Sequence, residues 1–278
     1  MEAKKYILFL GNFDPLSKLV SAVLTKESSL RLIILDEHTL NRVKPILCVS
    51  SAKNIVMELD EKQLHFQDIS GILVNHFSID PINGDKNAEE RYWSEWSAFL
   101  GGLLTEHKNV LNPPSMGSWC GYFPTISKQI EIVTTCMESS LIIPDLIALI
   151  EYLHREDDVD KIPQEGYGYC VPYTFWSQVL NHTNLTDTAV EYGCCFIDNE
   201  YIFRGCGDAT ARRILKEIVS LYRSVTKTRI GEICIFLNDA NYYFRYAISR
   251  PQIRNFDWNS KLRIAEGIAD RLRNCGDQ

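Results

Sequence analysis

The chain has 278 residues, of which 45% are hydrophobic, and its formal net charge is −7. This length suits two compact lobes or one large domain, and the hydrophobic content is enough for a substantial core. The negative charge argues against a broad electrostatic surface for nucleic acid or for an anionic membrane.

The hydropathy pattern, the N-terminal residues and the cysteines favour a cytoplasmic protein. No window approaches 18 uncharged apolar residues, and the N-terminal residues MEAKKYILFLGNFD lack the pattern of a cleaved signal peptide. The nine cysteines form no CxxC pair, and most of them lie in apolar runs. Reduced, packed thiols are typical of that pattern. We therefore expect neither a disulfide framework nor a metal site, and no contact with membranes or nucleic acid.

The first elements in chain order predict a βαβ unit. An apolar strand over 5–10 is followed by a turn at Gly11 and by the pair Asp14-Pro15, which is a good start for a helix. Apolar residues then recur at helical spacing up to Leu24, and 31–35 returns as a strand. Parallel strands joined in this way imply a doubly wound, three-layer α/β lobe.

The segment GNFDPLSKL also resembles the GxFDPxHxGH signature of nucleotidyltransferases. That signature uses two histidines to bind phosphate, and Ser17 and Val20 stand at these positions. A nucleotidyltransferase would need this segment at a nucleotide-contacting helix N-terminus. The other interpretation is that Asp14 only caps a helix.

Further strands are expected over 46–50, 54–59 and 70–75, the last almost wholly apolar. A long helix should follow, because aromatic and leucine residues recur at helical spacing between Tyr92 and Leu104. In the second half, strands over 188–197 and 201–204 flank a turn at 198–200, and a helix follows over 209–225. A second hairpin over 230–237 and 242–248 and a final helix complete an α+β pattern.

The stretch from Lys108 to Asp145 contains the most informative order of elements. A short strand runs into the turn Asn112-Pro113-Pro114, and a helix that carries Lys128 leads to an apolar segment ending at Pro144. This order resembles the junction between the first two domains of ATP-grasp ligases, in the glutathione synthetase-like branch that includes peptide ligases of the microviridin (graspetide) type. The resemblance implies a pre-ATP-grasp-like α/β domain over 1–123 with a doubly wound parallel sheet. It also implies a reduced α+β ATP-grasp-like domain over 124–278.

The same resemblance implies positions for a nucleotide and a metal. Lys128 matches a lysine that contacts phosphate in the family, and Asn112 is a second nucleotide-binding position. With Gly231 and Gln252 as anchors, the family's three metal ligands fall on Cys234, Tyr246 and Ile248. None of these side chains suits a hard cation such as Mg²⁺, which prefers carboxylate, carbonyl and water oxygens. We therefore predict lost metal ligands, no metal and no cofactor.

These observations predict a pseudo-ligase rather than an active enzyme. It would bind a peptide, or a partner such as an intact ATP-grasp ligase, in a peptide-maturation or similar biosynthetic pathway, and a homodimer is possible. The alternative is an active but divergent ATP-dependent carboxylate-amine ligase that uses ATP and Mg²⁺. It would combine Lys128 with carboxylates such as Glu232, Asp239 or Glu200.

Overall fold

The computed structural model describes residues 5–26, 30–36, 39, 43–47, 55–59, 62–75, 99–114, 126–135, 141–142, 190–205, 207–238 and 241–274. The chain divides into two compact units, which are described here one by one. The first unit comprises Met1–Gly121 with Ala265–Gln278, and the second comprises Tyr122–Ile264. The predicted domain boundary between residues 123 and 124 lies outside the described residues and stays a prediction.

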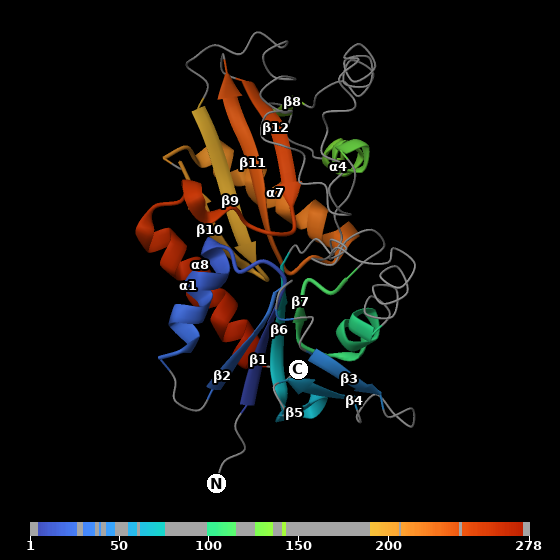
Figure 1. The fold of residues 1–278 in the computed structure, drawn as a ribbon. Helices are drawn as coiled ribbons and strands as arrows, with labels where there is room; N and C mark the ends of the chain where they lie inside the picture. The colour runs from blue at the N-terminus through green and yellow to red at the C-terminus, as the bar shows by residue number, and fades with distance from the viewer. Residues whose placement is uncertain are drawn as a thin grey trace, which may run out of the picture. The chain divides into compact units, whose positions relative to one another are not determined.

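The first unit contains a parallel four-stranded sheet in the order β2-β1-β6-β7 (Figure 1). Its strands are β1 (Lys5–Leu10), β2 (Leu30–Leu35), β6 (Ile69–Val74) and β7 (Val110–Leu111). Helix α1 (Pro15–Leu24) joins β1 to β2 and confirms the predicted βαβ unit. Strand β6 is buried along its whole length, which explains its continuous apolar sequence.

A small antiparallel sheet follows β2 in the chain. It has the order β3-β4-β5, with β3 at Val43–Leu47, β4 at Ile55–Leu59 and β5 at Lys62–His65. A short 3-10 turn at Phe66–Asp68 leads from β5 into β6. The strand predicted over 46–50 was misplaced, since it begins at Val43, and β5 was not predicted at all.

Asp14 caps the N-terminus of α1. Its side-chain Oδ1 accepts the backbone N–H of Ser17 at 2.8 Å, and Pro15 occupies the first turn. We expect Asp14→Ala to lower the free energy of unfolding by about 1 kcal/mol, while Asp14→Asn keeps most of the cap. Urea denaturation of both variants measures the difference. Equal stability of Asp14→Ala and the unchanged protein would contradict the capping role.

The helical stretch 99–106 packs on this sheet. Leu100, Leu103 and Leu104 are buried in one core cluster with residues of β1 and β6 such as Leu8 and Ile72. This confirms the end of the predicted aromatic-rich helix, whereas residues 92–98 lie outside the described part of the chain.

His107, which follows this helical stretch, is held as a neutral ring. Its Nε2 lies 3.0 Å from the carbonyl oxygen of Ile69, and its Nδ1 accepts the N–H of Asn109 at 3.1 Å. A ring that donates at one nitrogen and accepts at the other carries no charge. Burial lowers the pKa of His107, against the smaller opposing effect of the two backbone contacts.

The lowered pKa predicts a pH-dependent stability. Because an unfolded histidine titrates near about 6.5, the contribution of His107 is fully present above that pH and is lost as the pH falls through the folded-state pKa. We expect the free energy of unfolding to fall more steeply below about pH 6.5 in the unchanged protein than in His107→Gln. Urea titrations between about pH 8 and pH 5 measure both slopes. Identical slopes would show that His107 does not titrate in this way.

The C-terminal part of helix α8 (Trp258–Arg273) belongs to the first unit from Ala265 onward. The side-chain Nδ2 of Asn109 donates to the carbonyl oxygens of Ser70, Arg271 and Leu272, at 2.9, 2.9 and 3.2 Å. Two of these oxygens lie in the last turn of α8, where helical partners are missing. Asn109 therefore joins the end of the helix to strand β6.

The second unit contains a five-stranded sheet in the order β10-β9-β11-β12-β8. Its strands are β8 (Leu141–Ile142), β9 (Val190–Ile197), β10 (Glu200–Arg204), β11 (Ile230–Asn238) and β12 (Asn241–Ile248). The antiparallel pairs β9/β10 and β11/β12 confirm both predicted hairpins. Asp198 has a positive φ of 49° at the first hairpin turn, as an Asp in a tight turn readily adopts.

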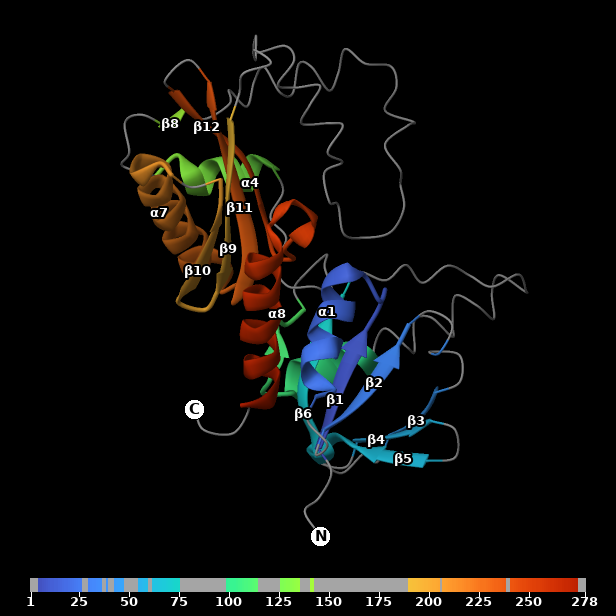
Figure 2. The ribbon, with the colours of Figure 1, turned by 90° about the vertical axis from the view of Figure 1, so that its left-hand side faces the viewer.

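Two helices cover one face of this sheet. Helix α7 (Ala209–Thr226) runs along it, as Figure 2 shows, and α4 (Ile126–Val133) contributes to the same core cluster. Asp208 caps α7 by accepting the N–H groups of Thr210 and Ala211 at 2.8 and 3.2 Å. A 3-10 turn at Ile253–Asn255 connects β12 to α8.

Candidate functional site

The face of the second sheet opposite α7 carries charged side chains. Cys194 and Ile233 point into the core beneath α7. Since neighbouring residues on a strand point to opposite faces, Glu191 of β9 and Glu232 of β11 lie on the other face. Arg204, at the end of β10, reaches both of them. Charges inside a sheet whose strands are otherwise apolar require partners.

A glycine makes room for the guanidinium of Arg204. The register pairs Arg204 with Gly193 on the central strand β9. A Cβ added at Gly193 would lie 2.9 Å from Nη2 of Arg204 and 3.0 Å from its Nε. Glycine weakens a strand interior, so its presence there marks the close approach of another group.

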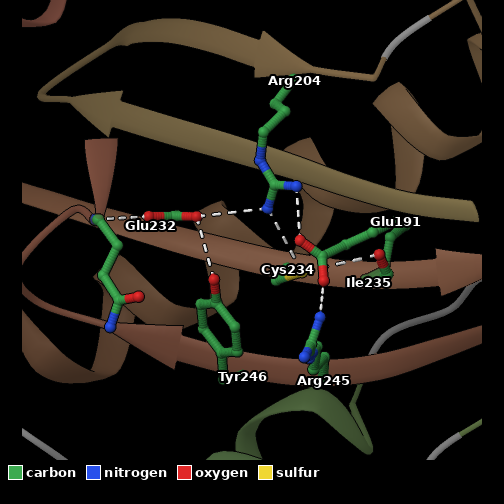
Figure 3. Close-up of polar contacts among 8 residues, drawn as sticks. Glu191, Arg204, Glu232, Cys234, Ile235, Arg245 and Tyr246 are labelled. Atoms are coloured by element: carbon green, nitrogen blue, oxygen red, sulfur yellow. Dashed lines mark hydrogen bonds and ion pairs between the residues drawn. The ribbon is translucent and has the colours of Figure 1, made fainter. Parts of the chain in front are cut away.

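Arg204 bridges two carboxylates, as Figure 3 shows. Its Nη1 lies 2.5 Å from Oε1 of Glu191, and its Nη2 lies 3.6 Å from Oε1 of Glu232. The side chain of Arg204 is 13% exposed and that of Glu232 is fully buried. The ring of Phe256 lies 5.7 Å from the Arg204 guanidinium carbon and covers it. The bridging arginine is thus screened from water on several sides.

A β-bulge brings a second arginine to the same place. The register of β11 and β12 shifts between Cys234 and Ile235, which leaves Arg245 as the extra residue of β12. Bulges redirect a side chain relative to the regular alternation. Arg245 pairs through Nη1 with Oε2 of Glu191, and its guanidinium carbon lies 5.9 Å from the ring centre of Tyr246. Each oxygen of Glu191 therefore faces a different guanidinium group.

Glu232 is held by neutral donors as well as by Arg204. The hydroxyl of Tyr246 donates to its Oε1 at 3.1 Å, and the backbone N–H of Gln252 donates to its Oε2 at 2.7 Å. Burial raises the pKa of the Glu232 carboxyl, and the Gln252 N–H and Arg204 oppose this effect. We name Glu191, Arg204, Glu232, Arg245 and Tyr246 together the arginine-carboxylate network.

The predicted metal-ligand positions fall within or beside this network. Cys234 pairs directly with Tyr246 across β11 and β12, and Ile248 lies opposite Glu232. The Sγ of Cys234 lies 3.8 Å from Nη2 of Arg204. Among the described residues, no group of three His, Cys, Asp or Glu side chains is placed to hold a metal ion. The side chains at these positions do not fit the oxygen-rich, hydrated octahedron that Mg²⁺ prefers.

The buried thiols of this sheet are expected to be unreactive in the folded protein. Burial raises the pKa of Cys234 to about 12, and it raises the pKa of Cys195 well above its usual value. Because the thiolate is the reactive form, we expect Cys194, Cys195 and Cys234 to resist iodoacetamide in the folded protein. All three should react after unfolding in urea. Peptide mass spectrometry of both samples reads the result, and rapid labelling of Cys234 in the native protein would contradict the burial.

Lys128 and Asn112, the predicted nucleotide contacts, belong to different units. Lys128 lies on α4, and its Nζ is 2.6 Å from Oε1 of Glu131 on the same helix. Its side chain is partly exposed. Asn112 is buried directly after β7 and has a positive φ of 55°, which fits the predicted Asn-Pro turn. Nucleotide binding by either residue stays a prediction.

The three carboxylates that an active, divergent ligase would use do not lie together in the described residues. Glu232 lies inside the network, Glu200 is exposed at the β9/β10 hairpin, and Asp239 lies outside the described residues. Sequence reasoning did not single out Glu191 or Arg245. Their signal was a charged residue within an otherwise apolar strand, in VEYGCCFI and in NYYFRYAI.

Comparison with solved structures decides the fold. No protein-family model and no curated sequence matches the chain. The macrocyclase MdnC from Microcystis aeruginosa MRC, bound with precursor peptide MdnA, superposes with a TM-score of 0.67 at 11% identity, covering 97% of this chain and 99% of MdnC. A RiPP-associated ATP-grasp ligase from Chryseobacterium gregarium, in complex with ADP and a leader and core peptide, gives 0.65 at 15% identity and 96% of each chain. The fold of this chain is ATP-grasp-like.

A third solved structure supports the same fold. The ATP-grasp ligase PsnB, complexed with a minimal precursor, has a TM-score of 0.62 to the ATP-grasp-like chain at 12% identity, covering 97% of this chain and 99% of PsnB. At these identities the likeness concerns the fold. In the described part of the ATP-grasp-like chain, no helix is long and apolar enough to span a membrane.

Proposed function

We propose that this ATP-grasp-like chain is a non-catalytic pseudo-ligase that binds a peptide in a peptide-maturation pathway. Its first unit corresponds in this proposal to a doubly wound pre-ATP-grasp-like lobe, and its second unit to a reduced ATP-grasp-like lobe. An intact ATP-grasp ligase is a further partner under this proposal, and self-association as a homodimer is compatible with it.

The peptide partner is supported by the solved structures of similar fold. MdnC is bound with precursor peptide MdnA, PsnB is complexed with a minimal precursor, and the Chryseobacterium ligase is in complex with a leader and core peptide. These proteins share their fold with almost the whole of this chain. A shared scaffold permits a shared class of partner, although fold alone does not assign function.

The non-catalytic status is supported by one observation above the others. At the positions where the family resemblance puts metal ligands, the second sheet carries Cys234, Tyr246 and Ile248, and the neighbouring carboxylate Glu232 is engaged by Arg204. Phosphoryl transfer in ATP-dependent ligases depends on a metal ion that neutralises the phosphates. A sheet face whose two carboxylates, Glu191 and Glu232, are already paired with arginine is unsuited to that role.

Two titrations test the proposal. The first adds synthetic peptides that match any short open reading frame next to the gene for this chain, and the second adds ATP with Mg²⁺; both are followed by calorimetry. We expect heat of binding from the peptide without nucleotide. Incubation of the peptide with the protein, ATP and Mg²⁺ should leave the peptide mass unchanged.

The same experiment also tests the alternative that the chain is an active carboxylate-amine ligase. A loss of one water from the peptide, together with ADP production, would identify a divergent ligase and overturn the non-catalytic proposal. Lys128→Ala and Glu232→Gln would then locate the activity, while Glu131→Gln on the same helix is the control for Lys128. Absence of peptide binding would remove the peptide partner.

A further inference from the structure

The arginine-carboxylate network contains equal numbers of opposite charges. Glu191 and Glu232 carry the carboxylates, and Arg204 and Arg245 carry the guanidinium groups. Arg204 lies between the two carboxylates, and Arg245 meets Glu191 from β12. Four strands, β9 to β12, each contribute at least one member of the network.

Two carboxylates brought together on a buried sheet face need a cation. Like charges at close range repel more strongly where water is excluded, and removing an ionised carboxylate from water has a large cost without a partner. Proteins commonly meet this need with a divalent metal or with arginine. In this sheet the space between Glu191 and Glu232 contains the guanidinium of Arg204.

The surroundings are built for guanidinium rather than for a metal. Gly193 leaves the room that the planar group needs, since a Cβ there would approach Nη2 of Arg204 to 2.9 Å. Phe256 lies 5.7 Å from the guanidinium carbon of Arg204, and an aromatic ring favours guanidinium as a cation. The remaining oxygen of Glu232 accepts the Gln252 N–H at 2.7 Å and so is already engaged.

We propose that Arg204 and Arg245 are built-in counter-ions that hold this pair of carboxylates in the way a divalent cation would. The sheet face is therefore complete without metal. Removing the guanidinium of Arg204 exposes a vacancy between two carboxylates that an added cation can fill. This inference concerns the metal alone and holds whether or not the chain binds a peptide or a nucleotide.

The test measures thermal unfolding of the full chain with EDTA, Mg²⁺, Mn²⁺ or millimolar guanidinium chloride, each against sodium chloride of equal ionic strength. The unfolding midpoint of the unchanged protein should not respond to the cation. In the Arg204→Ala variant, each of the cations Mg²⁺, Mn²⁺ and guanidinium should raise the unfolding midpoint. The expected rise is about 3–5 °C for every tenfold increase of the cation concentration above its dissociation constant. Arg212→Ala, an exposed arginine of α7 whose guanidinium carbon lies 5.8 Å from the Phe203 ring, is the matched control and should not respond.

A second variant keeps the result decisive if Arg204→Ala does not fold by itself. Arg245→Gln leaves Arg204 in place and should show a smaller response of the same sign. For either variant, recovery of the folded state by cation or guanidinium supports the inference, and no recovery overturns it. Mn²⁺ binding by the unchanged protein that Glu232→Gln abolishes would also overturn it, because the face would then take a metal beside its arginines. None of these readouts uses peptide or ATP, so failure here is separate from failure of the proposed function.

Discussion

Replacing Arg204 by methionine is expected to lower the free energy of unfolding by about 3–5 kcal/mol, because a buried ion pair that loses one member leaves a charge without its partner. Glu232 is fully buried, so its carboxylate would stay buried after it loses the contact with Arg204. Glu191 would keep Arg245. Methionine has a similar length to the arginine stem, so the effect comes mainly from the missing charge.

Arg212→Met separates this loss from the loss of a ring contact. Arg212 lies on an exposed part of α7, and its guanidinium carbon is 5.8 Å from the ring of Phe203, close to the 5.7 Å between Arg204 and Phe256. We expect a change of about 0.5–1 kcal/mol at this exposed site. Equilibrium urea denaturation measures both variants. Equal losses would show that the arginine-carboxylate network does not stabilise the sheet.

A double variant tests whether the network acts as one unit. In Arg204→Met with Glu232→Gln, the uncompensated carboxylate is also removed. The summed losses of the two single variants should therefore exceed the loss of the double variant, by about 0.5–3 kcal/mol. Additive losses would mean that the two side chains do not interact, despite the 3.6 Å between Arg204 Nη2 and Glu232 Oε1.

Gly71→Ala is expected to lower the free energy of unfolding by about 3 kcal/mol, because the added methyl group has no room. An added Cβ would lie 2.5 Å from the carbonyl oxygen of Leu272 and 2.9 Å from Nδ2 of Asn109. Both neighbours are fixed: the first is helix backbone, and the second is held by its own hydrogen bonds to Ser70, Arg271 and Leu272. Relief requires the end of α8 to move away from β6.

Gly102→Ala is the matched control, because it adds the same methyl group within the first unit. Gly102 lies in the helical stretch 99–106, and a Cβ there would meet nothing within 4 Å. Alanine is the better helix former, so this variant should gain about 0.5–1 kcal/mol. Urea denaturation of both variants gives the comparison. A Gly71→Ala protein as stable as the unchanged protein would contradict the tight packing of α8 on β6.

The sequence predicted those parts of the fold that depend on local patterns. Strands β1 and β6 are continuous apolar runs, α7 repeats its apolar residues at helical spacing, and the turn at Asp198 separates two strands. Pro45 explains the misplaced strand: the prediction began after it, yet β3 is an edge strand, where a proline is tolerated. Strand β5 was missed because KQLH offers one apolar side chain.

The network could not be predicted by the same means. It depends on the pairing of four strands and on the bulge at Arg245, and neither has a local signature. The family resemblance pointed to Cys234 and Tyr246, which the structure places side by side. It did not indicate that Glu191 and Arg245 would lie beside them, or that the arginines there would pair with carboxylates. The contact of Asn109 with Arg271 is beyond local patterns too, since 162 residues separate the two.

The course of helix α8 has a consequence for how the protein is made. The helix begins at Trp258 in the second unit, and its residues from Ala265 onward complete the first unit, where Asn109 and Gly71 receive them. The residues of α8 that complete the first unit therefore leave the ribosome only after the whole second unit has been synthesised. Until then strand β6 lacks its covering helix turn. The first unit therefore cannot be completed before the second unit has been synthesised. A nascent chain stalled before Ala265 lacks the helix turn that packs on β6.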